Sequence, residues 1–215
     1  LFMVHLGVHM HSKITVLALA ISAIMLTACH DDNDDKSTST PTPTPTTLIK
    51  TGVLIDAAVS GIRYDSGSQQ GTTDATGQFK YQGNESIQFK LGNINLGYAK
   101  ASDILLLKAL NNGVNGRGNL SDTTLNRAVL LQTLDNDGDS SNGIQISSAT
   151  ADKLKAASIA FNTTPTEFAT KLTQLLSDTG ITATVVDHAI AKNHLLVAEA
   201  EALGKATENF TDGII

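Results

Sequence analysis

The sequence predicts an α+β fold: a small antiparallel β-sandwich followed by a small helical bundle, after a cleaved signal peptide and a disordered tether. Three observations predict it. Apolar residues first alternate with a period of two, and later they recur with helical spacing. Ahead of both regions, an apolar run gives way to a segment without aliphatic or aromatic side chains. We therefore expect four parts, at residues 1–28, 29–47, 48–102 and 103–215.

The first part has the features of a secretory signal. Lys13 precedes the apolar run Ile14–Leu26, which is shorter than the ~20 residues that a membrane-spanning helix needs. Met10 offers a start close to Lys13, so residues 1–9 are interpreted as an upstream extension.

The residues that follow are Leu26-Thr27-Ala28-Cys29, and they resemble the bacterial lipobox. The resemblance implies that Cys29 carries a diacylglycerol thioether, that the signal is cut before it, and that the new amine takes an acyl chain such as palmitate. Several acyl chains, at ~0.8 kcal/mol per buried CH₂, anchor a protein stably. His30 rather than Asp follows the Cys, which by analogy with enterobacterial sorting favours the outer membrane of the cell envelope.

Residues 30–47 form the expected tether. They are rich in Asp, Ser, Thr and Pro and contain no side chain that could repay the entropy of ordering. Pro41, Pro43 and Pro45 favour an extended spacer of ~3.1 Å per residue. We interpret the aspartates at 31–35 as a solvated charge run rather than as a metal cluster.

The region Leu48–Ala101 has the alternation of half-buried antiparallel strands, with turn residues every 8 to 12 positions. The turns are Asp65–Ser68, Asp74–Gly77, Gln82–Asn84 and Gly92-Asn93. The side chains expected on the buried face are Val53, Ile55, Phe79, Tyr81, Ile87, Phe89, Leu91, Ile94, Leu96 and Tyr98.

Gly52–Tyr64 and Gly71–Phe79 together resemble the carboxypeptidase regulatory-like (transthyretin-like) module found at the N-terminus of exported bacterial lipoproteins. The resemblance covers roughly residues 50–98. It implies a prealbumin-like sandwich that serves binding, display or spacing beside adhesin, receptor or hydrolase domains, without catalytic residues of its own. Tyr64, Phe79 and Phe89 are expected in its core.

After Ala101 we expect four or five short amphipathic helices, with a glycine-rich loop at Asn111–Leu120. Capping residues set their boundaries. Asp103 precedes a first short helix at Ile104–Leu110, and Ser121-Asp122 precede a second at Leu125–Leu134. Thr164–Glu167 begin a third helix, which Gly180 ends, and Asp187 begins a last helix that runs to about Leu203, with Gly204 after it.

An acidic loop at 135–143 lies between two of these helices. Asp135, Asp137 and Asp139 occupy positions 1, 3 and 5 of an EF-hand-like loop, and Asn142 offers a further oxygen, which together predict a weak Ca²⁺ site. Ser140 replaces the glycine of position 6, and Ile146 replaces the glutamate of position 12. The alternative is an Asx-rich turn that leads into a short strand at Gly143–Ile146.

No catalytic or phosphate-binding motif occurs in the sequence. Cys29 is the sole thiol, and His188 and His194 lie six positions apart, which does not place them as a metal pair on one helix face. A formal charge of −6 argues against nucleic-acid binding. Apart from possible Ca²⁺, no cofactor is expected.

We therefore expect a membrane-anchored envelope lipoprotein that acts as a non-catalytic binding, adhesion or scaffold module for an unknown protein or glycan partner. The alternative is the N-terminal accessory portion of a larger exported enzyme such as a hydrolase, because modules of the family it resembles precede catalytic domains.

Overall fold

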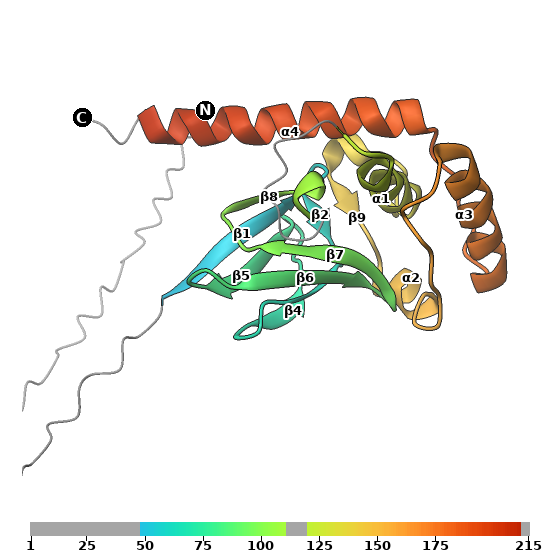
Figure 1. Cartoon of the computed structure of the whole chain (residues 1–215), viewed down its shortest axis with the longest axis horizontal. Helices are drawn as coiled ribbons and strands as arrows, with labels where there is room; N and C mark the ends of the chain where they lie inside the picture. Colours follow the sequence, from blue (N-terminus) through green and yellow to red (C-terminus); the bar gives the residue numbers. More distant parts are fainter. Residues whose placement is uncertain (1–47, 111–119, 212–215) are drawn as a thin grey trace, which may run out of the picture. The chain divides into compact units, whose positions relative to one another are not determined.

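The computed structural model describes residues 48–110 and 120–211, with side chains up to Gly204. The predicted signal peptide, Cys29 and the tether lie outside the described residues. The α+β class is confirmed, since the described part of the chain combines largely antiparallel sheets with four α-helices, and all strands but β9 precede the first helix (Figure 1). The strands are β1 (Ile49–Ile55), β2 (Val59–Ser60), β3 (Arg63–Asp65), β4 (Gln70–Thr72), β5 (Gln78–Gln82), β6 (Ser86–Leu91), β7 (Ile94–Lys100), β8 (Ile104–Leu106) and β9 (Ile144–Gln145).

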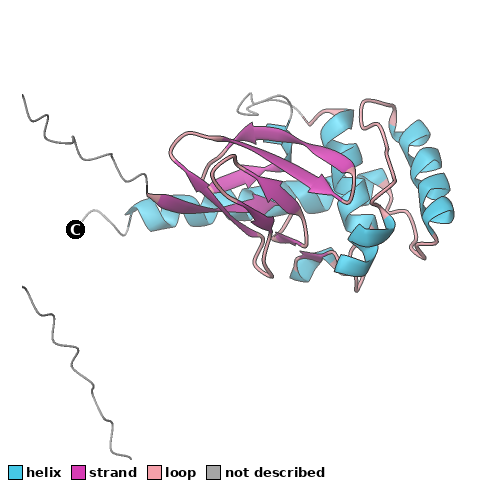
Figure 2. Ribbon diagram, turned by 90° about the horizontal axis from the view of Figure 1, so that it is seen from below, coloured by secondary structure: helices cyan, strands magenta, loops and turns pink. Residues whose placement is uncertain are grey.

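The strands form three sheets, which Figure 2 shows beside the helices. One has the order β5-β1-β8, with β1 antiparallel to β5 and parallel to β8. The second is antiparallel throughout, in the order β4-β3-β6-β7. The third is the short parallel pair β2-β9.

The predicted alternation holds in β5 and β6. In β1 it is wrong by one residue, because Leu54 is fully buried in the core whereas Val53 is only half-buried. In β5 the buried Phe79 and Tyr81 alternate with Gln78, Lys80 and Gln82, because successive side chains of a strand point to opposite faces. Phe79 lies at the centre of the core. Its ring contacts Phe89 edge-on at 5.3 Å and lies 6.0 Å from that of Tyr64, between centroids.

The prediction that Tyr98 faces the core is wrong, since 44% of its surface is exposed. The cause is a register shift between β6 and β7 at Phe89 and Lys90. Gly97 adopts a φ of +117° at this bulge. The extra residue reverses the alternation, so that Ala99 rather than Tyr98 faces the core.

The helix predicted at Ile104–Leu110 is also wrong in its first half. Residues 104–106 form β8, which pairs with β1 in parallel, and only Leu107–Leu110 form a 3₁₀ helix, η1. The sequence hides this pairing because the partner strand lies about 50 positions away. Asp103 caps no helix there; its side chain accepts a hydrogen bond from the Tyr81 hydroxyl.

Two predicted helices have the expected caps. α1 (Asp122–Thr133) begins after Ser121, whose hydroxyl accepts from the Thr124 amide. α3 (Pro165–Thr179) begins after Thr164 and ends at Gly180, which adopts the left-handed conformation with φ +61°.

The remaining helical region departs from the sequence expectation. A short helix that was not predicted, α2 (Ser148–Lys153), is capped by Ser147. α4 (His188–Thr211) begins after Asp187 as expected, but it continues through Gly204 instead of ending there. A glycine inside a helix costs only ~1 kcal/mol, so it does not by itself end one.

The two predicted regions share one hydrophobic core. Buried residues of the strands and of α1, α3 and α4 belong to a single cluster. β8 and β9 join strands of the first region, and α4 lies against α1 and β1. Among the described helices, none combines the length and the apolar character needed to cross a membrane.

Candidate binding site

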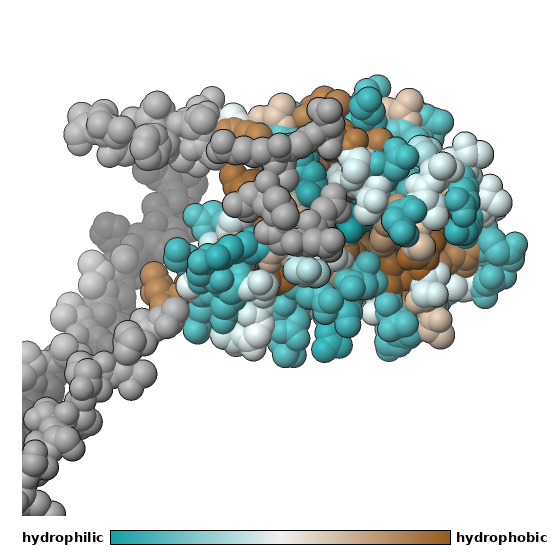
Figure 3. All heavy atoms as spheres, viewed as in Figure 1, coloured by the Kyte–Doolittle hydropathy of each residue, from teal (hydrophilic) through white to brown (hydrophobic). Residues whose placement is uncertain are grey.

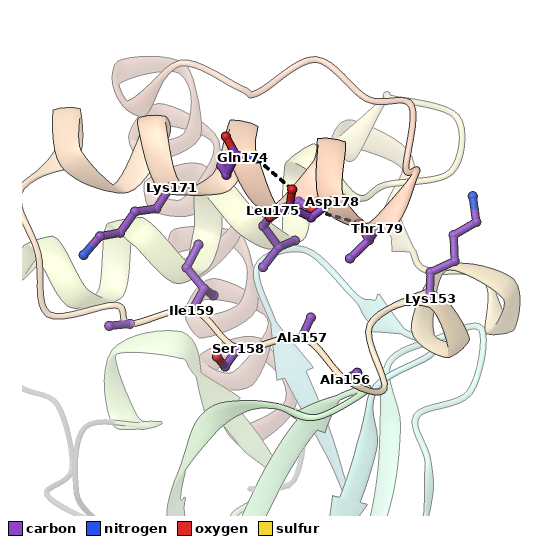
Figure 4. A pocket seen from close by; sticks show the side chains of 11 residues that line it. Lys153, Ala156, Ala157, Ser158, Ile159, Lys171, Gln174, Leu175, Asp178 and Thr179 are labelled. Carbon is purple, nitrogen blue, oxygen red and sulfur yellow. Dashed lines mark hydrogen bonds between the residues drawn. The ribbon is translucent and has the colours of Figure 1, made fainter.

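A large hollow lies between α3 and the segment that follows α2, and its volume is about 970 Å³ (Figure 4). We call it the α3 groove. Figure 3 shows apolar surface between α2 and α3, in addition to the apolar surface along α4. Small or aliphatic side chains form the apolar part of its lining: Ala156, Ala157, Ile159, Ala160 and Leu175.

One wall of the α3 groove is the run Ala157–Ala160, which contains no helix, turn or bend. Its side chains alternate, with Ala157 and Ile159 half-buried against the core and Ser158 and Ala160 exposed. Within the described residues, no hydrogen bond involves the backbone of Ser158, Ile159 or Ala160. The run therefore has the exposure pattern and the unused donors and acceptors of an edge strand.

The rim of the α3 groove is polar. Lys171 pairs with Glu167 at 2.8 Å one turn away on α3, and Gln174 Nε2 donates to Asp178 at 2.7 Å. Lys153 Nζ donates at 2.7 Å to the carbonyl of Gly180, at the C-terminal end of α3. Lys153 thus stabilises a helix end and keeps a positive charge that no carboxylate of the described residues neutralises.

A second polar cluster lies inside the core, around Asp56 directly after β1. Asp56 is fully buried, and Gln132 Nε2 of α1 donates to its two carboxylate oxygens at 3.1 and 3.2 Å. His194 of α4 approaches from the other side, with Nδ1 3.3 Å from Asp56 Oδ1. Gln132 also donates to the Ala191 carbonyl at 3.2 Å. The cluster joins β1, α1 and α4.

Both ring nitrogens of His194 face acceptors. Nδ1 faces the Asp56 carboxylate, and Nε2 lies 2.8 Å from the backbone carbonyl of Ser140. An imidazole that donates from both nitrogens is protonated, so this geometry favours imidazolium. The hydrogen bond to Asp56 raises the pKa of His194 above 6.5 against the opposing effect of burial. Burial raises the pKa of Asp56, and the bonds from His194 and Gln132 oppose that shift.

His188, at the first position of α4, holds a different contact. Its Nε2 lies 2.8 Å from Oδ1 of the buried Asn126. The Asn126 amide donates to the carbonyls of Phe161 and Thr163 at 2.8 and 2.9 Å, so Oδ1 acts as the acceptor for His188. Burial lowers the pKa of His188 below 6.5, because it disfavours the charged imidazolium form.

The acidic loop is closed by its own hydrogen bonds. Asp137 accepts from the Asp139 amide and from Asn142 Nδ2, each at 2.9 Å. Asp139 accepts from the Ser141 amide and hydroxyl and so caps the 3₁₀ turn η2 (Ser140–Asn142). Asp135 lies closer to the core, where its Oδ1 accepts from the Gln145 amide at 2.8 Å. This arrangement is an Asx-rich turn that leads into β9.

No group of three or more His, Cys, Asp or Glu side chains is positioned to hold a metal ion within residues 48–110 and 120–204. The Ca²⁺ site at Asp135, Asp137, Asp139 and Asn142 stays a prediction, as does lipidation of Cys29 outside the described residues.

No protein-family description matches the chain, and no curated protein or solved structure matches it either. Function is therefore inferred from the residues themselves. Sequence reasoning missed both the Asp56–His194 pair and the α3 groove. Asp56 stands where a strand ends, and His194 has leucine after it, so neither position carries a local signal of the contact.

Proposed function

We propose that this chain is a lipid-anchored protein of the bacterial cell envelope whose folded part is a non-catalytic binding module. The α3 groove is the observation that carries the binding role. It combines an apolar floor with the unused backbone groups of Ser158–Ala160. Such a wall suits an extended segment of a partner protein, which adds main-chain hydrogen bonds and seats alternate side chains in the hollow.

The anchor is proposed from the sequence Leu26-Thr27-Ala28-Cys29 and the tether that follows it. Acyl chains on Cys29 would hold the protein at a membrane, preferably the outer one, while residues 30–47 separate the binding module from the bilayer. Replacement of Cys29 by Ser should move the protein from the membrane fraction to the soluble fraction. A Cys29→Ser protein that still sediments with membranes would refute the anchor.

We further propose that the two larger sheets form a prealbumin-like sandwich, as the lipoprotein module it resembles would. The contacts of Phe79 in β5 with Phe89 in β6 and with Tyr64 in β3 support this, because they join one sheet to the other. Side chains that interdigitate between two sheets form the core of a sandwich.

The non-catalytic role is supported by the contacts of the two described histidines. His194 uses both nitrogens for Asp56 and the Ser140 carbonyl, and His188 donates to Asn126. A general base needs a free lone pair within reach of a substrate proton. His194 in this protonated arrangement offers none. The ring of His188 packs against that of Phe168 in a T-shaped contact, with 6.2 Å between the centroids.

Site-specific crosslinking in intact cells tests the binding role. A photoreactive residue at Ser158, which is exposed in the α3 groove, should form a discrete protein adduct. The same residue at the exposed Lys50 of β1 is the matched control and should form none, because Lys50 does not line the groove.

A second variant tests whether the adduct at Ser158 forms because the partner occupies the α3 groove. Ala156→Arg fills the hollow from an exposed position and should abolish the adduct at Ser158 without unfolding the protein. An adduct that forms equally at Lys50, or that survives Ala156→Arg, would show that the groove is not the binding surface.

A further inference from the structure

Two positive side chains lie directly opposite each other on the four-stranded sheet. Arg63 of β3 pairs with Lys90 of β6 in the antiparallel register, and both side chains are exposed. Directly opposed side chains share one face of the sheet, and like charges in this position destabilise it. Neither takes part in an ion pair with another described residue. The sheet therefore carries a repulsion that a bound anion would relieve.

The same two cations line two adjacent hollows. One hollow, of about 320 Å³, lies between this sheet and α2, and the other, of about 270 Å³, lies toward Asp65 and Gln88. The first is also lined by Thr72, Ser148 and Lys155, which add two hydroxyl groups and a third cation.

At two glycines that line the first hollow, Gly61 and Gly92, the backbone lies directly against the segments on either side of α2. A Cβ at Gly92 would lie 2.5 Å from the Leu154 carbonyl carbon, and one at Gly61 would lie 2.0 Å from the Ile146 oxygen. The Asn93 amide donates to the Leu154 carbonyl at 3.0 Å and fixes the β6–β7 turn to the end of α2. The three cations are therefore presented from elements that are held together.

The acidic side chains near these hollows do not neutralise the positive charge of Arg63, Lys90 and Lys155. Asp152 pairs with Lys155 at 2.9 Å, but both side chains are more than half exposed, and such surface pairs contribute little. Asp65 Oδ1 accepts from the Gly67 amide at 2.8 Å. The two hollows thus hold three cations against two carboxylates, in a chain whose formal charge is −6.

We propose that Arg63, Lys90 and Lys155 form a binding site for a phosphate group. The guanidinium of Arg63 can contact two oxygens of a tetrahedral oxyanion at once, while Lys90 and Lys155 contribute compact charges. The hydroxyl groups of Ser148 and Thr72 line the same hollow and are able to donate to a remaining oxygen. The site is independent of the α3 groove and of the function proposed for it.

Titration with inorganic phosphate against chloride, at constant ionic strength, tests the site on the full chain carrying Cys29→Ser. Phosphate should raise the melting temperature and shift the amide resonances of Gly61 and Gly92. Arg63→Gln and Lys90→Gln should each remove both responses. Lys100→Gln is the matched control, because Lys100 is an exposed cation of the same sheet opposite Ser86 and lines neither hollow.

The repulsion gives a second readout without any ligand. In chloride alone, Lys90→Gln should raise the melting temperature by roughly 1–3 °C, because it removes the like-charge pair, whereas Lys100→Gln should not. A substitution that only damaged the fold would lower the melting temperature instead. If wild type shows no phosphate response, or if Lys90→Gln responds as wild type does, the proposed site is wrong.

Vesicles separate the two sources of a phosphate group. The wild-type protein is mixed with phosphatidylglycerol vesicles. If it binds them, if inorganic phosphate displaces it, and if Lys90→Gln abolishes the binding, the site is assigned to a lipid headgroup. A phosphate response without vesicle binding assigns it to free phosphate. The proposal would be overturned if Lys90→Gln bound the vesicles as well as wild type does and inorganic phosphate had no effect on the protein.

Discussion

Nδ1 of His194 lies 3.3 Å from the carboxylate of Asp56, although 138 residues separate the two in sequence. The contact joins the end of β1 to the long helix α4. Asp56 is completely buried, and the side chain of His194 is only 17% exposed, so little water competes for the carboxylate. A buried carboxylate needs its partners, because its charge is otherwise uncompensated.

Removal of His194 should therefore destabilise the fold. We expect His194→Ala to lower the free energy of unfolding by about 3 kcal/mol, since it leaves Asp56 buried with Gln132 as its remaining side-chain partner. Urea denaturation measures this. Lys192→Ala is the matched control on the exposed face of α4 and should change stability by less than ~0.5 kcal/mol. Equal losses in the two variants would contradict a special role for the pair.

The protonation of His194 can be followed directly. We expect its ring resonances to titrate above pH 6.5, because the hydrogen bond and the charge of Asp56 favour imidazolium. A raised pKa stabilises the fold fully below pH 6.5, and this contribution is lost as the pH rises through the raised pKa of the folded protein. Asp56→Asn should lower the pKa of His194, since burial then acts without the carboxylate. A pKa of His194 that is unchanged in Asp56→Asn would refute the ion pair.

His188 should behave in the opposite way. Burial lowers its pKa, so its contribution to stability is present above pH 6.5 and is lost as the pH falls through the lowered value. The two histidines thus act on different sides of pH 6.5. We expect the His188 ring to titrate below pH 6.5 in the same NMR experiment. A pKa of His188 above that of His194 would show that burial does not set the pKa of His188.

The sequence carried enough information for the local features of this fold. Turn residues and alternation located the strands around Phe79 and Phe89 because those signals depend on near neighbours. The caps Thr164 and Gly180 bounded α3 for the same reason. Features that depend on distant partners were not predictable. β8 takes its form from pairing with β1, and Tyr98 is exposed because of a bulge.

The candidate sites likewise include features that depend on distant partners, which the sequence did not predict, and features that depend on near neighbours, which it did. The α3 groove arises because Ala157–Ala160 runs past a helix without pairing, which no single-sequence pattern reveals. The register that opposes Arg63 to Lys90 depends on how β3 and β6 align across 27 positions of sequence. The acidic loop was located correctly as a loop, because its Asp and Asn side chains form local turns.

The acidic loop allows a direct comparison of turn and calcium site. Asp137→Ala removes the acceptor of the Asp139 amide and of Asn142, so we expect a lower melting temperature, by roughly 1–3 °C, in the absence of calcium. The measurement is a thermal melt in chelator and in millimolar Ca²⁺. A Ca²⁺-dependent rise in wild type that Asp137→Ala abolishes would establish the calcium site, because only an ion bound to the folded state stabilises it. The same melt in both solutions assigns the loop to turn formation alone.

The close approach of Gly61 to Ile146, the residue directly after β9, gives the last prediction. Gly61 and Gly67 have nearly the same φ, +82° and +84°, which costs a residue with a side chain ~1 kcal/mol at either position. Only Gly61 has a neighbour in the way, since a Cβ there would lie 2.0 Å from the Ile146 carbonyl oxygen, whereas a Cβ at Gly67 would meet nothing within 4 Å. We expect Gly67→Ala to cost ~1 kcal/mol and Gly61→Ala to cost at least ~2 kcal/mol more, because the β2–β9 pair must separate. Urea denaturation compares the two variants. Equal losses would show that the contact between Gly61 and Ile146 does not constrain the folded chain.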